Sequence, residues 1–298
     1  MRQKFTWTEH QLNKLNKAKD ILAEFDEYKP LTLRQIYYQF VSKGFIENNV
    51  SQYTMLSTFL KNARIDGEIG WEDIEDRTRV FHNLSGFYDK ESFIQQELDN
   101  FLIGYYRNLT QTQEQYIEVW IEKDALSSLF SKICYNYTVP VVVCKGFSSV
   151  SFLNNFKKRL DKQNKPSLML YFGDFDPSGM EMMQSMEITL KNELNVSALK
   201  LKRVALTEND IFEFKLPHSP DALKRTDTRA NKYLKLYGEL AVELDALPPV
   251  ILIKKIKDAI ENELDIEKFN KEVEIEKTEF DVLNKLKKDV QEFVEKGF

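Results

Sequence analysis

The stretch LMLYFGDFDPSGME, residues 168–181, decides the fold of this 298-residue sequence. Its first five side chains are apolar and predict a buried strand, and the proline and glycine that follow predict a turn into a helix near Ser178. Asp174 and Asp176 lie between the strand and the helix, only two residues apart. Because like charges at this spacing repel each other, we expect the pair to serve a purpose beyond folding.

Strand and helix patterns alternate on either side of this stretch. Such alternation is typical of a parallel sheet with helices on both faces, and ligands of these sheets bind at the carboxyl ends of the strands. We therefore expect an α/β domain over residues 113–250. Its strand-like runs are YIEVWIE at 116–122, VPVVVC at 139–144, SLMLYFGD at 167–174 and LKLKRVAL at 199–206, and helical patterns begin near residues 124, 149 and 178.

A second strand brings another carboxylate to the same edge of the predicted sheet. Glu122 ends the first strand as Asp174 ends the third, so we expect Glu122, Asp174 and Asp176 to converge. Three oxygen ligands without histidine or cysteine favour Mg²⁺ or Mn²⁺ over Zn²⁺, and a cation relieves their repulsion. The competing interpretation is that the aspartates only cap the next helix, but a cap needs one residue and gives Glu122 no role.

The amino-terminal part of the sequence has helical patterns. Apolar residues recur at helical spacing over residues 7–25, and a third helix is expected over residues 51–63. Between them, Thr32 can cap a helix that Gly44 ends. The segment ARIDGEIGW, 63–71, then predicts a short hairpin. Three helices and a hairpin are the order of a DNA-binding winged helix, and a small helical domain of another kind fits equally well.

Three motifs give the sequence a family resemblance. IEKDAL at 121–126 and GDFDPSG at 173–179 resemble the two signatures of a Toprim domain, in the form found in the A subunit of topoisomerase VI and the meiotic double-strand-break transesterases. LTLRQIYYQF at 31–40 is similar to the segment that carries the DNA-attacking tyrosine of those proteins. RQIYYQFVSKGFI, IEDRTR and VELDALPP more closely resemble a group of bacterial and phage Toprim proteins.

The resemblance implies an α/β protein in three parts. A winged-helix DNA-binding domain with a helical connector occupies residues 1–112, a Toprim domain with a Rossmann-like parallel sheet occupies residues 113–250, and carboxy-terminal helices occupy residues 251–298. It also implies Mg²⁺-dependent (or Mn²⁺-dependent) cleavage of DNA by a homodimer, since cutting both strands takes two sites. The chain has no GxxxxGK[ST] loop, so any ATP-driven strand passage requires an unidentified ATPase partner.

The resemblance also implies the catalytic residues. The phenolate of Tyr38 attacks a phosphodiester and remains linked to the 5′ end of the DNA, while Glu122 and the two aspartates hold the metal that steadies the phosphate. Arg34, one helical turn before Tyr38, is placed to bind the phosphate and to favour the phenolate. From the pattern alone, Tyr37 and Tyr38 are equally well interpreted as aromatic residues of a helical core.

Two alternatives stay open. In the first, a metal-activated water cuts the DNA and Tyr38 is structural; in the second, the chain binds DNA without cutting it. Glu243 and Asp245 form a further acidic pair that either joins the metal site or caps a helix. The predicted phosphate contacts are Arg64, Arg77, Arg79, Lys123 and Lys145, each of which is also compatible with ordinary surface charge.

Composition and charge limit the classes of protein to which the chain can belong. The net charge is −5, but residues 261–298 carry all of it, and residues 141–170 hold six basic side chains against Asp161 alone, so a DNA-binding face is compatible with the sequence. The two cysteines have no metal-binding or disulfide spacing. No apolar run is long enough to cross a bilayer and the first residues do not form a signal peptide, so we expect a cytoplasmic protein without a membrane partner.

Overall fold

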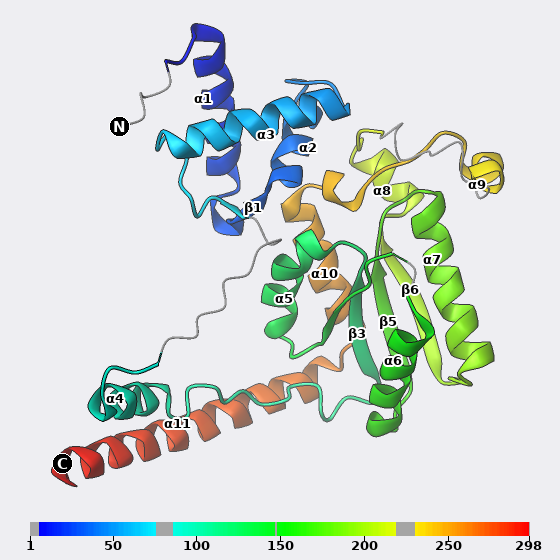
Figure 1. Cartoon of the computed structure of the whole chain (residues 1–298). Helices are drawn as coiled ribbons and strands as arrows, with labels where there is room; N and C mark the ends of the chain where they lie inside the picture. Colours follow the sequence, from blue (N-terminus) through cyan, green and yellow to red (C-terminus); the bar gives the residue numbers. More distant parts are fainter. Residues whose placement is uncertain (1–5, 76–85, 147, 219–229, 298) are drawn as a thin grey trace. The chain divides into compact units, whose positions relative to one another are not determined.

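The computed structural model describes residues 6–75, 86–146, 148–218 and 230–297 (Figure 1). Contacts between residues divide the chain into two compact units. Unit 1 consists of residues 1–77 and 115–260, and unit 2 of residues 78–114 and 261–298. The amino-terminal helices and the parallel sheet therefore belong to one unit, whereas the expected connector groups with the carboxy-terminal helix.

Unit 1 is built on a four-stranded sheet in the order β4-β3-β5-β6. All three neighbouring pairs run parallel, which confirms the prediction of a parallel α/β sheet. The register aligns Ile121 of β3 with Phe172 of β5, so the residues that follow these strands emerge at one edge. The strands are β3 (Tyr116–Ile121), β4 (Val141–Val143), β5 (Ser167–Phe172) and β6 (Leu199–Ala205).

Helices cover both faces of this sheet (Figure 1). Trp120 meets Phe156 of α6 edge-on, with ring centroids 4.9 Å apart. Phe172 points to the other face, where its ring lies 4.9 Å from that of Phe130 of α5. Such alternation follows from the two-residue period of a strand. The first face carries α6 (Val150–Gln163) and α7 (Pro177–Ile188), and the second carries α5 (Ser127–Tyr135) and α10 (Pro249–Glu261).

A buried carboxylate fastens α6 to the sheet. The side chain of Glu118, in β3, is fully buried and pairs with Arg159 of α6. One oxygen of Glu118 accepts hydrogen bonds from Arg159 Nε at 2.7 Å and from the Tyr116 hydroxyl at 2.7 Å. The other accepts from Arg159 Nη2 and from the Trp120 indole N–H, both at 2.9 Å. Two donors on each oxygen offset the cost of burying this charge.

The amino-terminal helices form where the sequence predicts them. Thr8 and Thr32 each begin a helix with a capping box, because the glutamine three residues later returns a hydrogen bond to the threonine backbone. Gly44 follows the second helix with φ +68°, a conformation that glycine adopts without strain. The elements are α1 (Glu9–Glu24), η1 (Asp26–Tyr28), α2 (Leu33–Ser42) and α3 (Val50–Ile65).

The hairpin expected over residues 63–71 is wrong. Helix α3 continues to Ile65, which leaves too few residues for a strand before Gly67, and Gly67 (φ +80°) lies in the turn that ends the helix. A two-residue parallel pair forms instead between β1 (Leu31–Thr32) and β2 (Ile74–Glu75). A winged helix stays a prediction.

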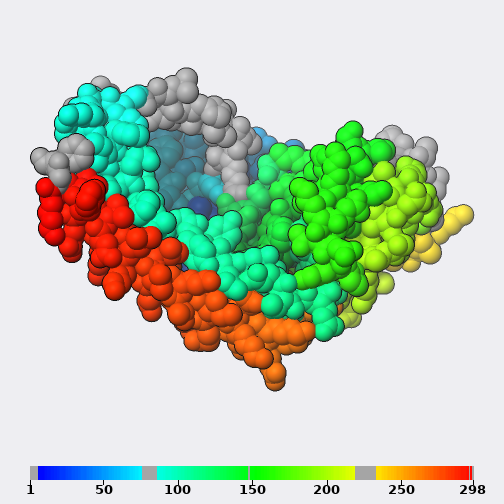
Figure 2. Space-filling view, turned by 90° about the horizontal axis from the view of Figure 1, so that it is seen from below, coloured from blue at the N-terminus to red at the C-terminus, as the bar shows by residue number. Residues whose placement is uncertain are grey.

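Unit 2 consists of a long helix and the segment expected to be a connector, which runs along it (Figures 1 and 2). Arg107 donates to Glu272 at 2.6 Å and to Glu279 at 2.8 Å, and the Gln113 amide exchanges hydrogen bonds with the Asp265 backbone. Within the described ranges, no helix combines the length and apolar character that a membrane span requires. Unit 2 contains α4 (Lys90–Asn100) and α11 (Ile266–Gly297), and the remaining elements of unit 1 are η2 (Asp124–Leu126), η3 (Thr189–Glu193), α8 (Glu208–Glu213), α9 (Ala230–Tyr237) and η5 (Leu244–Ala246).

Candidate functional site

Glu122 and Asp174 meet at the carboxyl ends of β3 and β5. The Glu122 N–H donates to the Phe172 carbonyl at 2.9 Å, and the Asp174 N–H donates to Glu122 Oε2 at 2.9 Å. Gly173 permits this approach, because a Cβ at that position would lie 2.8 Å from Glu122 Oε2 and 2.6 Å from the hydroxyl of buried Tyr171. The glycine of the GDFDPSG motif therefore makes room for the Glu122 carboxylate.

Asp176 begins helix α7. Its Oδ1 accepts hydrogen bonds from the Gly179 N–H at 2.6 Å and from the Ser178 hydroxyl at 3.0 Å, and Pro177 occupies the first helical position. The capping interpretation thus holds for Asp176. It does not extend to Asp174, whose carboxylate points elsewhere.

Asp174 is nearly buried and binds two groups from other segments. Its Oδ1 accepts the Leu244 N–H at 2.7 Å, and its Oδ2 lies 3.0 Å from Lys123 Nζ. Lys123 Nζ also lies 3.0 Å from Glu243 Oε2 and 3.4 Å from Asp245 Oδ2. The chain after α9 therefore returns to the sheet edge and brings the second acidic pair to Lys123.

We call the five carboxylates of this region the acidic edge: Glu122, Asp174, Asp176, Glu243 and Asp245. Asp245 differs from the others, because its side chain is fully buried and, within the described residues, neither of its oxygens accepts a hydrogen bond. Buried carboxylates without hydrogen bonds are costly, so Lys123 is important for keeping this group in place.

Helix α2 contributes to the same region of unit 1. The guanidinium of Arg34 pairs with Glu243, and Arg34 is also electrostatically coupled to Tyr38. The Tyr38 side chain is only 3% exposed and packs edge-on against Tyr37 with ring centroids 5.2 Å apart. Tyr37 has a structural role, since its hydroxyl contacts Asn48 Oδ1 at 3.0 Å and the Asn49 carbonyl at 3.1 Å.

Arg203 is a further cation that the sequence analysis does not predict. It lies on β6, the neighbour of β5, and donates to the Leu206 carbonyl at 2.7 Å and to the Gly173 carbonyl at 3.1 Å. It also donates to the carbonyl of Asp174, and its guanidinium lies 5.4 Å from the centre of the Tyr171 ring. Arg203 thus fixes the GDFDPSG turn through its carbonyl oxygens.

Burial and repulsion between neighbouring carboxylates raise the pKa of Glu122, Asp174 and Asp245. Burial raises the pKa of Glu122, and the charge of Asp176 adds to this effect while the Asp174 N–H opposes it. Burial also raises the pKa of Asp174 and of Asp245, against the attraction of Lys123. Glu243 differs, because Lys123 and Arg34 outweigh its burial and lower its pKa.

The donor chemistry of the acidic edge fits a hard divalent cation. Among the residues that the structure describes, five carboxylates face three cationic side chains, Lys123, Arg34 and Arg203, which leaves a formal charge of −2 that one such ion would neutralise. In their present positions, however, no three His, Cys, Asp or Glu side chains in the described residues are placed to hold one ion. Cation binding therefore requires a side-chain rearrangement. Lys123 is the group that would have to move, because its ammonium pairs with Asp174.

The structure describes three of the five predicted DNA contacts, Arg64, Lys123 and Lys145. Arg64 donates to the Trp71 carbonyl at 2.8 Å and its guanidinium lies 4.7 Å from the ring centre of this exposed tryptophan, while Lys145 pairs with Asp124 at 2.7 Å. Arg77 and Arg79 lie outside the described residues. Contact of Arg64, Lys123 or Lys145 with phosphate stays a prediction.

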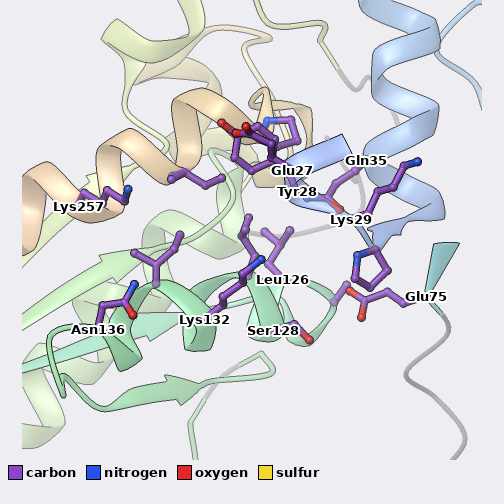
Figure 3. A pocket seen from close by; sticks show the side chains of 16 residues that line it. Glu27, Tyr28, Lys29, Gln35, Glu75, Leu126, Ser128, Lys132, Asn136 and Lys257 are labelled. Carbon is purple, nitrogen blue, oxygen red and sulfur yellow. The ribbon is translucent and has the colours of Figure 1, made fainter. Parts of the chain in front are cut away.

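A pocket of about 230 Å³ lies elsewhere in unit 1, between η1, α2, α5 and α10 (Figure 3). Its lining combines apolar residues such as Leu126 and Ile253 with Lys132 and Lys257. None of the carboxylates of the acidic edge lines it. The acidic edge and this pocket are therefore separate features.

Comparisons with known proteins leave the family open. No protein-family model matches the chain, and no curated protein matches it. The Toprim resemblance accordingly rests on the quoted motifs, and any activity of the acidic edge has to be argued from its chemistry.

Proposed function

We propose that the chain cleaves DNA phosphodiesters with the help of Mg²⁺ or Mn²⁺ at the acidic edge. The observation that supports this most is the approach of Glu122 to Asp174 at the ends of β3 and β5, beside Asp176, in a group with a formal charge of −2. A purely structural ion-pair cluster would balance its charges. An excess of buried carboxylates with raised pKa values is typical of a site that binds a cation.

In this proposal each group of the chain has a separate task. Glu122, Asp174 and Asp176 would hold the cation, which when bound neutralises phosphate charge and assists deprotonation of the nucleophile. Arg34 carries its positive charge at the same edge, where it pairs with Glu243 and can also attract a phosphate. Arg203 keeps the backbone of Gly173 and Asp174 fixed, so that the carboxylates keep their spacing.

The nucleophile has two candidates. If Tyr38 attacks, its phenolate oxygen forms a bond to phosphorus, the bond from phosphorus to the 3′ oxygen breaks, and the protein remains linked to the 5′ end. The proximity of Tyr38 to Arg34 supports this route. The second candidate is a water molecule, and the burial of Tyr38 at 3% exposure favours it, since a buried phenol has to become accessible before it can attack.

A plasmid assay tests the proposal. Supercoiled plasmid is incubated with the protein and Mg²⁺ or Mn²⁺ and is analysed with and without protease digestion. We expect nicked or linear DNA that requires the metal, and DNA freed only by protease would show a covalent link to the protein, as the tyrosine route requires. Intact plasmid with every cation, despite DNA binding, would leave the chain as a DNA-binding protein.

Three variants assign the roles. Asp174→Asn should reduce cleavage at least about 100-fold, because a group that acts on transition-state charge is removed while DNA binding is retained. Tyr38→Phe should abolish cleavage and covalent adducts together on the tyrosine route and leave cleavage intact on the water route. Tyr37→Phe is the matched control, since it removes a neighbouring hydroxyl that binds the Asn48 side chain and the carbonyls of Glu47 and Asn49.

A further inference from the structure

The ammonium of Lys123 lies close to three carboxylates. Its Nζ lies 3.0 Å from Asp174, 3.0 Å from Glu243 and 3.4 Å from Asp245. Only Asp174 belongs to the carboxylates expected to hold the cation. Lys123 therefore connects the expected cation ligands to the second acidic pair.

Asp174 is fully engaged in this arrangement. One oxygen accepts the Leu244 N–H at 2.7 Å and the other pairs with Lys123. A divalent cation at the second oxygen would lie beside the ammonium, and the two positive charges would repel each other. The finding that no three acidic side chains in the described ranges are placed to hold one ion agrees with this.

The side chain of Lys123 is free to move away from Asp174 on its solvent-exposed side. Its side chain is 18% exposed, so the ammonium can turn toward solvent or toward an anion. Arg34 pairs with Glu243 and would keep that carboxylate neutralised. Arg34 also attracts Asp245 electrostatically, but Lys123 is the cation that forms an ion pair with it among the described residues, and neither of its oxygens accepts a hydrogen bond there, so Asp245 favours the return of Lys123.

We infer that Lys123 and a divalent cation compete for Asp174, and that a DNA phosphate lifts this competition by drawing Lys123 away. The inference rests on the proposed function and adds to it a mode of regulation: DNA and the cation bind cooperatively. Because such coupling is reciprocal, the cation tightens DNA binding by the same factor by which DNA tightens cation binding.

Calcium titration by isothermal calorimetry, with and without a short DNA duplex, tests this inference independently of cleavage. For the native protein we expect the duplex to lower the Kd for Ca²⁺ about tenfold, which corresponds to about 1.4 kcal/mol of coupling. In Lys123→Met the competitor is absent, so Ca²⁺ should bind about tenfold more tightly without DNA, and the duplex should add little.

Lys255→Met is the matched control. Lys255 is also half-buried and pairs at 2.7 Å with a buried aspartate, Asp210, that does not belong to the acidic edge, so its loss should leave the affinity for Ca²⁺ unchanged. Lys123→Arg keeps the positive charge and should keep both the weak affinity and the coupling. If Lys123→Met does not fold by circular dichroism, these two proteins and the native coupling still decide the matter.

The outcomes are distinguishable. If Ca²⁺ binds but Lys123→Met neither tightens it nor reduces the coupling, Lys123 does not compete and the inference is wrong, while the proposed function stands. If the native protein binds Ca²⁺ without any coupling to DNA, the inference is also wrong. Absence of Ca²⁺ binding in all of these proteins, with and without DNA, would overturn the proposed function itself.

Discussion

Two glutamates of one segment, Glu118 within strand β3 and Glu122 directly after it, lie in opposite surroundings. Glu118 is fully buried, pairs with Arg159 and has two donors on each oxygen. Glu122 belongs to a group in which, among the described residues, carboxylates outnumber cations and Asp245 accepts no hydrogen bond. A buried carboxylate is thus stabilised where its donors are complete and costly where they are not, and we propose that the second place binds a cation.

The largest effect on stability is expected from breaking the ion pair between Glu118 and Arg159. Arg159→Met leaves the buried charge of Glu118 without its cation and should lower the free energy of unfolding by about 3 kcal/mol, measured by urea denaturation. Lys158→Met is the control, because Lys158 is exposed on the same helix and should change stability by less than about 0.5 kcal/mol. A loss below about 1 kcal/mol for Arg159→Met would mean that the pair is not the anchor of α6.

At the acidic edge we expect a substitution to stabilise the protein. Asp245→Asn removes a buried charge that has no hydrogen bond and should raise the free energy of unfolding by about 1 kcal/mol in the absence of divalent cations. Asp210→Asn is the matched control: Asp210 is equally buried but accepts the Thr207 N–H at 2.9 Å and pairs with Lys255, so its replacement should destabilise the protein. Destabilisation by both variants would remove the contrast between buried carboxylates with and without hydrogen bonds.

A smaller effect is expected from pH. Burial and the nearby Glu122 raise the pKa of Asp174, so the folded state holds this proton more tightly than the unfolded state. The resulting contribution to stability is present at low pH and is lost as the pH rises above the ordinary carboxyl value of about 4. The stability gained by Asp174→Asn over the native protein should therefore be larger at about pH 8 than at about pH 5, measured by urea denaturation without divalent cations. A difference that does not grow with pH would contradict the raised pKa.

The sheet and its acidic residues are predictable because they depend on local patterns. Apolar runs and the intervening helical patterns predict the parallel strands, and the carboxyl ends of neighbouring strands bring Glu122 and Asp174 together. Capping threonines likewise predict the starts of α1 and α2. In each case the signal lies within a few residues of the feature it specifies.

The rest of the site depends on contacts between distant segments. Glu243 and Asp245 reach Lys123 only because the chain returns to the sheet after α9, and Arg34 reaches Glu243 from a helix more than two hundred residues earlier. Arg203 sits in a strand pattern that also suits an exposed basic residue, so only the neighbouring carbonyls reveal its role. The hairpin at 63–71 fails for a local reason, since α3 extends into it.

The most direct test of the central claim is the location of a bound cation. Crystals of the protein soaked with Mn²⁺ and measured for anomalous scattering would reveal where the ion lies. We predict a peak in contact with Glu122 and Asp174, beside Asp176, with the Lys123 ammonium withdrawn from Asp174. A structure at saturating Mn²⁺ in which Lys123 still occupies Asp174 and no peak lies at the acidic edge would contradict the account.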